Sequence, residues 1–183
     1  MTHDAARELA AADLPDGREL TVRLATVADA PVALEVIHAA FLARPVVGEK
    51  PEALADDLGS VRARIEHGTG YLAFVGDEPA GLVMTAHQQG AMRLGRVGVL
   101  PQFREQGVAS FLVEVVLEHL ATTGEERVQL LARKEFPRIQ AWWGRHGFSP
   151  AGDEGNCVVM ARSLPVAVEV PDADAMRALG SRL

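Results

Sequence analysis

The chain has 183 residues, of which 48% are hydrophobic and 23% charged, so it is long enough for one well-buried globular domain. Its formal net charge of −7 argues against nonspecific binding to nucleic acid, and no apolar run approaches the ~20 residues of a membrane span. The N-terminus is polar and unlike a signal peptide, and the single Cys157 excludes an internal disulfide, so we expect a cytoplasmic protein. No Cys/His cluster has zinc-ligand spacing, so we expect no metal. We likewise expect no membrane and no direct nucleic-acid partner.

Hydrophobic periodicity predicts alternating strands and helices along the chain. Thr26 and Asp29 have the spacing of a capping box, which predicts the start of the first helix. The predicted elements are a strand over 19–25, a helix ending at Phe41, a helix from Leu54 to Gly68, strands over 71–75, 80–87 and 92–100, a helix over 108–123, a strand over 127–132, a helix over 137–147 and a strand over 156–161.

The resulting order, β-α-α-β-β-β-α-β-α-β, predicts an α/β fold around one mixed sheet. We expect one domain over residues 19–164, preceded by an N-terminal extension over 1–18. Residues 165–183 form a C-terminal tail, which we interpret either as an ordinary appendage or as the start of a second domain.

The stretch VGVLPQFREQGVAS, residues 97–110, predicts an anion-binding loop. A strand ends at Pro101, a polar turn follows, and a helix starts at Gly107, which directs several backbone N–H groups and the positive end of the helix dipole at one point. Arg104 would add a fixed charge that grips phosphate oxygens, and Gly107 would let a ligand approach the backbone. The alternative is a plain strand-to-helix turn with a surface arginine, and the loop alone leaves both open.

The same stretch resembles the acyl-CoA signature of the GNAT superfamily of N-acyltransferases, whose core is Q/R-x-x-G-x-G/A and which here runs from Arg104 to Ala109. The stretch FPRIQAWWGRHGFSPAG, residues 136–152, is similar to the second element of that family, a helix leading into Gly-Phe. The resemblance covers roughly residues 20–164. It implies a mixed, mostly antiparallel central sheet flanked by helices, with acetyl-CoA as cosubstrate.

The resemblance also implies where acetyl-CoA is bound. The pantetheine arm would lie along the splayed strand that holds Val97 and Val99, and the Val99 N–H would donate to the thioester oxygen. The pyrophosphate would sit on backbone amides from Arg104 or Gln106 through Ser110. The residues expected to bind the cosubstrate are Val97, Val99, Arg104, Gln106, Gly107, Val108, Ala109 and Ser110.

The implied reaction is direct attack on acetyl-CoA by the primary amine of a small molecule or peptide. No covalent enzyme intermediate is needed, so we expect Cys157 to be a buried, inert thiol.

Departures from the family pattern leave the general acid and base unassigned. Trp143 stands where the family often has a tyrosine, and Phe136 where it often has an asparagine. The segment from His87 to Arg104 contains no Asp or Glu. His87 is a candidate base acting through water, and the alternative is a solvent-facing histidine at the end of its strand.

An acidic patch precedes and opens the second predicted helix. It could attract a cationic amine, or it could be a solvated helix face. Its members are Glu49, Glu52, Asp56 and Asp57.

Two classes of function remain open on the sequence. The first is an acetyl-CoA-dependent N-acetyltransferase. The second is a catalytically weak acyl-CoA-binding sensor or assembly module. Residues 166–183 weakly resemble the start of the ATPase that assists threonylcarbamoylation of adenosine in tRNA, so they are either the junction to such an ATPase or an ordinary appendage. The acceptor and the oligomeric state, a homodimer included, are not determined by the sequence.

Overall fold

The computed structural model describes residues 7–45, 48 and 50–165. The strands are β1 (Glu8–Asp13), β2 (Glu19–Leu24), β3 (Thr69–Val75), β4 (Glu78–Gln88), β5 (Ala91–Val99), β6 (Arg127–Arg133), β7 (Ser149–Glu154) and β8 (Cys157–Ser163). The helices are α1 (Ala30–Leu42), α2 (Leu58–His67), α3 (Val108–Thr122) and α4 (Pro137–Arg145), with short 3-10 turns at Val27–Asp29, Glu52–Ala55 and Pro101–Phe103.

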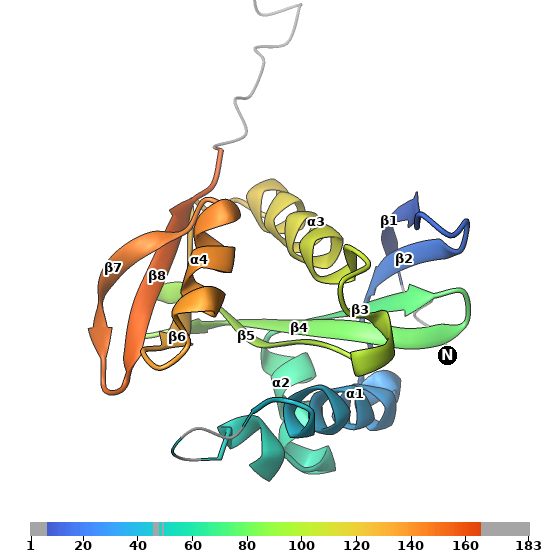
Figure 1. Ribbon diagram of the computed structural model, residues 1–183, viewed down its shortest axis with the longest axis horizontal. Coiled ribbons are helices and arrows are strands. Elements are labelled where there is room, and N and C mark those ends of the chain that lie inside the picture. Colours follow the sequence, from blue (N-terminus) through green and yellow to red (C-terminus); the bar gives the residue numbers. More distant parts are fainter. Residues whose placement is uncertain (1–6, 46–47, 49, 166–183) are drawn as a thin grey trace, which may run out of the picture.

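The strands form one eight-stranded sheet in the order β1-β2-β3-β4-β5-β6-β8-β7 (Figure 1). The pair β5 and β6 is parallel, and every other neighbouring pair is antiparallel. The prediction of a mixed, mostly antiparallel sheet flanked by helices is therefore confirmed.

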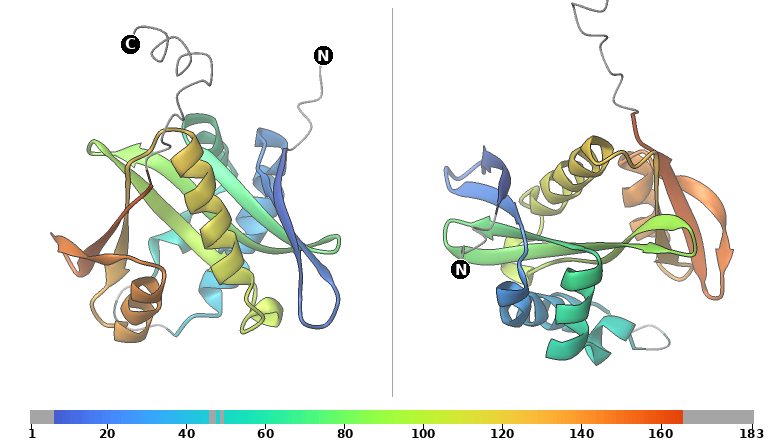
Figure 2. Two further views of the ribbon diagram at one scale, coloured as in Figure 1. Left: turned by 90° about the horizontal axis from the view of Figure 1, so that it is seen from above. Right: turned by 180° about the vertical axis from the view of Figure 1, so that it is seen from behind.

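Helices cover both faces of the sheet, with α1 and α2 on one face and α3 on the other (Figures 1 and 2). The strand β3 shows how the sequence produces this arrangement, because successive side chains point to opposite faces. Tyr71 and Ala73 belong to the buried cluster that includes the inner face of α3. Leu72, between them, packs in the cluster formed with α1 and α2. The strand is apolar on both faces because both faces are covered.

Two edge strands add to the predicted order. Residues 8–13, within the region expected to be an N-terminal extension, form β1 and pair with β2. At the other edge, β7 is exposed along its whole length and pairs with β8. Its sequence, SPAGDE, has no apolar alternation from which a strand could be predicted.

The second helix starts later than the sequence predicts. The short turn over Glu52–Ala55 ends at Asp56, whose backbone is extended, and α2 begins only after Asp57. Asp57 caps the helix by accepting a hydrogen bond from the Ser60 N–H at 2.7 Å. The tail over 166–183 lies outside the described residues. Within the described part of the chain, no helix has the length and apolarity to cross a membrane.

The strand β5 separates from β6 after a short stretch of pairing. The described parallel pairs are only Met92 with Val128 and Arg93 with Gln129. The rest of β5 toward Val99 is paired with β4 but, among the described residues, has no ladder partner on the β6 side. The backbone N–H groups on that edge can therefore donate to a ligand.

A β-bulge lies in the same part of β5. Leu82 of β4 pairs with Gly98, and Met84 pairs with Gly95, so two residues of β5 stand opposite one residue of β4. One of the two is Arg96, whose φ of 51° is in the left-handed region that a non-glycine residue rarely adopts. The bulge changes the local direction of the strand just before its free edge reaches the predicted anion loop.

Candidate functional site

The predicted anion loop connects the free edge of β5 to the start of α3. Gly107 is the N-cap residue of α3 with a φ of 86°, and a Cβ at this position would meet no atom within 4 Å. The helical hydrogen bonds start with Phe111 N–H to Gly107 O at 3.0 Å, so the N–H groups of the preceding helix turn have no intrahelical acceptor. The loop therefore has open space in front of backbone donors, as an anion site requires.

The structure brings the predicted site residues together along this path. Val97 and Val99 lie on the free edge of β5, while Val108, the first residue of α3, has a buried side chain and contributes to the loop only through its backbone. The Gln106 side chain donates to Gln102 O at 2.8 Å and accepts from Arg18 at 2.9 Å, which fixes the turn before the helix. The members that complete the first turn of α3 are Gly107, Val108, Ala109 and Ser110.

Arg104 is placed differently from the sequence expectation. Its guanidinium donates to Val99 O at 3.2 Å and, at the C-terminal end of α1, to Ala40 O at 2.9 Å and Ala43 O at 3.4 Å. The last carbonyls of a helix have no intrahelical donor, so the arginine is held there instead of projecting into the loop. In this arrangement Arg104 fastens α1 to the end of β5, and only its backbone remains with the loop.

Arg44 is a second cation at this edge, and the sequence analysis did not identify it. One of its terminal nitrogens donates to Val97 O at 2.6 Å, and its guanidinium lies 3.9 Å from the centre of the Phe41 ring. Burial, and secondarily the charge of Arg104, lowers the pKa of Arg44 to about 10, which leaves it protonated at neutral pH. No local sequence signal marks Arg44, because its role depends on how α1 packs against β5.

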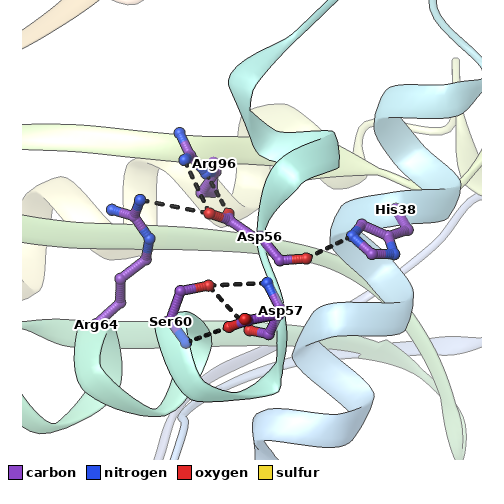
Figure 3. Close-up of polar contacts among 6 residues, drawn as sticks. All are labelled: His38, Asp56, Asp57, Ser60, Arg64 and Arg96. Carbon is purple, nitrogen blue, oxygen red and sulfur yellow. Dashed lines mark hydrogen bonds and ion pairs between the residues drawn. The ribbon is translucent and has the colours of Figure 1, made fainter.

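A charged cluster, Asp56 with Arg64 and Arg96, lies on the face covered by α1 and α2 (Figure 3). Asp56 is only 7% exposed. Its carboxylate accepts from Arg96 Nε at 2.6 Å and from a second Arg96 nitrogen at 3.1 Å, and Arg64 approaches it at 3.4 Å. The ring of His38 on α1 lies 2.9 Å from the Asp56 carbonyl oxygen. The buried Asp56 carboxylate thus ties α2 to the bulge of β5, while α1 is joined to Asp56 through its backbone carbonyl.

The expected acidic patch is divided between the interior and the surface, because Asp56 is buried whereas Glu52 and Asp57 are exposed. Asp56 is paired with two arginines, and Asp57 caps α2. The hydrogen bond from the Ser60 backbone is the main cause that lowers the pKa of Asp57. Glu49 lies outside the described residues. Next to the cluster, Arg64 lines an open hollow of about 330 Å³ together with Ser60, Ala63, His67 and Ala86.

The aromatic candidates for a general acid lie in the core. Trp143 is 5% exposed and packs edge-on against Phe148, with ring centres 5.1 Å apart. Tyr71 is the single tyrosine of the chain, and its hydroxyl lies 2.9 Å from His119 Nδ1. Burial raises the pKa of Tyr71 to about 12, so it is a poor proton donor to a departing thiolate.

His87 is a residue of β4 and lies beside the end of β5 that is remote from Val99. It is paired in register with Met92, whereas Val99 is paired with Gly81, and the six residue steps from Gly81 to His87 correspond to roughly 20 Å along the strand. Its ring lies 2.9 Å from Glu125 Oε1, and the side chain is 62% exposed. The structure thus shows a solvent-facing histidine at the strand end and does not bring it to the free edge of β5 beside Val99.

Cys157 is the first residue of β8 and is half-buried. Burial raises the pKa of the Cys157 thiol, which disfavours the nucleophilic thiolate. This environment agrees with an inert thiol, although the side chain is less buried than expected.

Comparisons with known proteins agree with this geometry. A model of the acetyltransferase (GNAT) family matches residues 35–148. The fold is similar to the ribosomal-protein-S18-alanine N-acetyltransferase from Escherichia coli, with 18% identity, a TM-score of 0.65, and coverage of 82% of this chain and 97% of that chain. It is also similar to the PaiA N-acetyltransferase from Thermoplasma acidophilum in complex with coenzyme A, with 13% identity, a TM-score of 0.69, and coverage of 79% and 98%.

A third similar structure is an acetyltransferase from Thermus thermophilus, with 21% identity, a TM-score of 0.60, and coverage of 79% of this chain and 97% of that chain. At these identities the likeness establishes the shared fold. A comparison of the chain with curated protein sequences found no match.

Proposed function

We propose, because the chain belongs to the acetyltransferase (GNAT) family, that it transfers an acetyl group from acetyl-CoA to the primary amine of a small molecule or peptide. The amine attacks the thioester directly. The observation that carries this proposal is the free edge of β5, which the short 3-10 turn at Pro101–Phe103 joins to the uncapped first turn of α3. Backbone donors at these two places match an elongated ligand with an acyl arm at one end and a diphosphate at the other.

Each part of this path has a distinct task in the proposed reaction. The Val99 N–H polarises the thioester oxygen as negative charge develops on it during attack. The N–H groups of Val108, Ala109 and Ser110 hold the diphosphate with help from the positive end of the α3 dipole. Arg44 keeps a cation next to the Val97 carbonyl and so fixes the position of the strand edge.

The free energy of deprotonation decides which amines are good acceptors. A lysine with a pKa of about 10.4 costs roughly 4 to 5 kcal/mol to deprotonate at pH 7, whereas an α-amine near 7.7 to 8.0 costs about 1 kcal/mol. The Asp56 carboxylate is engaged by two arginines and is not placed as a free base. The leaving thiol has a pKa of about 8.5 and departs near neutral pH without a strong acid.

We therefore propose an α-amine of a peptide or small molecule as the preferred acceptor. One structure with this fold is a ribosomal-protein-S18-alanine N-acetyltransferase, and alanine carries no side-chain amine, so an α-amine acceptor is compatible with the fold. The second candidate is the catalytically weak acyl-CoA-binding module. It is favoured by the positions of Trp143, Tyr71 and His87, none of which supplies an acid or base at the end of β5.

Release of CoA thiol from acetyl-CoA, measured with a panel of amines and peptides, tests both candidates. Turnover supports the acetyltransferase, whereas tight acetyl-CoA binding without turnover on any acceptor supports the module. For active acceptors, kcat/KM from pH 6 to 10 should be compared on an α-amine and an ε-amine of matched structure. The α-amine should lead by about a hundredfold or more at pH 7. An ε-amine preference at pH 7, with a plateau below pH 8, would mean that the chain supplies a general base.

A further inference from the structure

A chain of three polar side chains joins the first turn of α3 to the end of α4. Ser110 Oγ lies 3.3 Å from His146 Nε2, and His146 Nδ1 lies 2.9 Å from Glu114 Oε1. Ser110 and Glu114 are one helical turn apart on α3, while His146 is the C-cap residue of α4. The His146 side chain is only 11% exposed, so its two nitrogens are committed to these two partners.

The partners determine which nitrogen carries the proton. A carboxylate only accepts hydrogen bonds, so Glu114 requires a proton on His146 Nδ1. In the neutral imidazole Nε2 is then an acceptor, and the Ser110 hydroxyl donates its proton to it. The Ser110 oxygen consequently presents lone pairs, not a proton, to the space in front of the loop. That orientation is unfavourable for a phosphate, which needs donors.

Protonation of His146 reverses the orientation of the hydroxyl. An imidazolium donates from both nitrogens, so Nε2–H would point at Ser110 Oγ and release the hydroxyl proton toward the loop. A phosphate at the loop favours the protonated state of His146 in two ways: its negative charge attracts the imidazolium, and its oxygen accepts a hydrogen bond from the Ser110 hydroxyl.

We propose that His146 is a positioning residue that couples CoA binding to the uptake of a proton. When the diphosphate occupies the loop, His146 takes one proton from solvent at Nε2. Nε2–H then donates to Ser110 Oγ, and the Ser110 hydroxyl donates to a phosphate oxygen. This coupling rests on the proposed function, which places the diphosphate at the loop. It goes beyond that function by making cosubstrate affinity depend on a residue of α4.

Other charges around His146 set the balance of this coupling. Glu114 on α3 favours the imidazolium, although its side chain is 46% exposed and partly screened. Arg162 on β8 donates to the His146 carbonyl at 2.8 Å and lies 3.8 Å from Glu114 Oε2, so it opposes the imidazolium and competes for the carboxylate. On α4 the Trp142 ring centre lies 4.2 Å from that of His146, and Arg145 is an exposed neighbour. The bound phosphate would supply the additional negative charge.

Isothermal titration with CoA at about pH 7 tests the coupling, because the measured heat depends on the buffer whenever binding takes up protons. Two buffers with different ionisation enthalpies and no phosphate give the number of protons exchanged. We expect wild type to take up a clearly measurable fraction of a proton more than His146→Gln. His146→Gln should also bind CoA about tenfold more weakly, the effect of losing a hydrogen bond that a charged group supports.

Matched variants separate the coupling from a structural effect. Glu114→Gln should reduce proton uptake, whereas Glu118→Gln, at an exposed position one turn further along α3, should leave it unchanged. Arg145→Gln should likewise leave it unchanged, although it alters a charge next to His146. Protons exchanged by CoA itself are common to all variants, so the difference between wild type and variant is the relevant quantity.

Several outcomes would overturn the proposal, and they differ from failure of the proposed function. Equal proton uptake by wild type and a folded His146→Gln, with CoA still bound, overturns the coupling and leaves the acetyltransferase intact. Should His146→Gln not fold, unchanged uptake in Glu114→Gln overturns it. If Gly107→Glu binds CoA as well as wild type does, or if wild type does not bind CoA, both the loop site and the coupling are wrong.

Discussion

The loop from Arg104 to Ser110 follows the end of β5, whereas the Asp56 cluster contacts the bulge of β5 through Arg96. The two regions are built in different ways. The loop is one contiguous stretch whose proposed ligand groups are backbone N–H donors at the start of α3. The Asp56 cluster joins side chains as far apart in sequence as Asp56 and Arg96, and it lies on the face covered by α1 and α2. A backbone site can be recognised from a short motif, whereas a side-chain cluster exists only after the chain has folded.

The two regions also hold left-handed backbone conformations by different means. The loop uses Gly107, for which a φ of 86° carries little steric cost. The bulge of β5 has Arg96 at a φ of 51°, which costs of order 1 to 3 kcal/mol for a residue with a side chain. Two hydrogen bonds to the buried Asp56 offset this cost. The loop is thus specified locally, while the bulge depends on a distant partner.

The largest effect is expected where the loop loses its glycine. In Gly107→Glu, the new residue must adopt a φ that is strained for any side chain, and its carboxylate lies at the proposed diphosphate site. CoA affinity should therefore fall about a thousandfold, or ~4 kcal/mol. Isothermal titration measures this change. Gly124→Glu is the matched control, because Gly124 has a φ of 89°, equally open space and a position beyond the other end of α3. Equal losses in both variants would mean that strain alone is responsible and that the loop is not the CoA site.

Removing the charge from the Asp56 cluster should give the next largest effect, on stability. Asp56→Asn leaves Arg96 and Arg64 without their carboxylate at a buried position, and we expect the free energy of unfolding to drop by about 3 kcal/mol. Denaturant unfolding followed by circular dichroism measures it. Asp57→Asn is the control, since asparagine caps a helix as well as aspartate does, and it should leave the free energy of unfolding nearly unchanged. A loss of similar size in the two variants would show that the cluster does not hold the bulge.

The contrast between these regions explains which helices and strands could be predicted from the sequence. The apolar repeats of α3 and the buried strands β3 to β5 are properties of single segments, so their elements are predicted. The edge strand β7 has no buried face and is stabilised by pairing with β8, which no local pattern reveals. The start of α2 was predicted too early because Asp56 leaves the helical path to reach Arg96.

The same reasoning applies to the candidate site. Gly107 and the residues that follow it stay a predicted diphosphate site, and the sequence could suggest them because the motif is contiguous and the proposed ligand groups belong to the backbone. Arg44 was missed, and the Arg104 side chain lies elsewhere than expected, because both guanidinium groups respond to carbonyls that tertiary packing brings close. The sequence shows that a charged side chain is present, but the fold determines which group it contacts.

Asp29 provides a local counterpart to Asp56 and a smaller expected effect. Two hydrogen bonds from Arg23 are the main cause that lowers the pKa of Asp29 from 3.8 to about 2. A carboxyl whose folded pKa is depressed adds stability above its unfolded pKa, and that stability is lost as the pH falls from about 4 toward 2. The contribution is about 2 kcal/mol when fully present.

Comparing wild type with Asp29→Asn tests this assignment. Asp29→Asn should be less stable by about 1 to 2 kcal/mol at pH 6, and the difference should shrink as the pH approaches 3. Denaturant unfolding at several pH values measures it. A difference that stays constant with pH would show that the ion pair with Arg23 is not the cause.

The smallest effect is expected at Cys157, which belongs to neither region. Direct attack by the amine forms no acyl-enzyme, and burial raises the pKa of this thiol, so its thiolate is scarce at neutral pH. Cys157→Ala should therefore keep kcat/KM within about threefold of wild type, less than the ~1.4 kcal/mol of a tenfold change. Mass spectrometry of the wild-type protein incubated with acetyl-CoA alone should find no acetyl group on Cys157. An acetyl-cysteine that an amine then discharges would place the chemistry at the start of β8, and the free edge of β5 would no longer be the site of transfer.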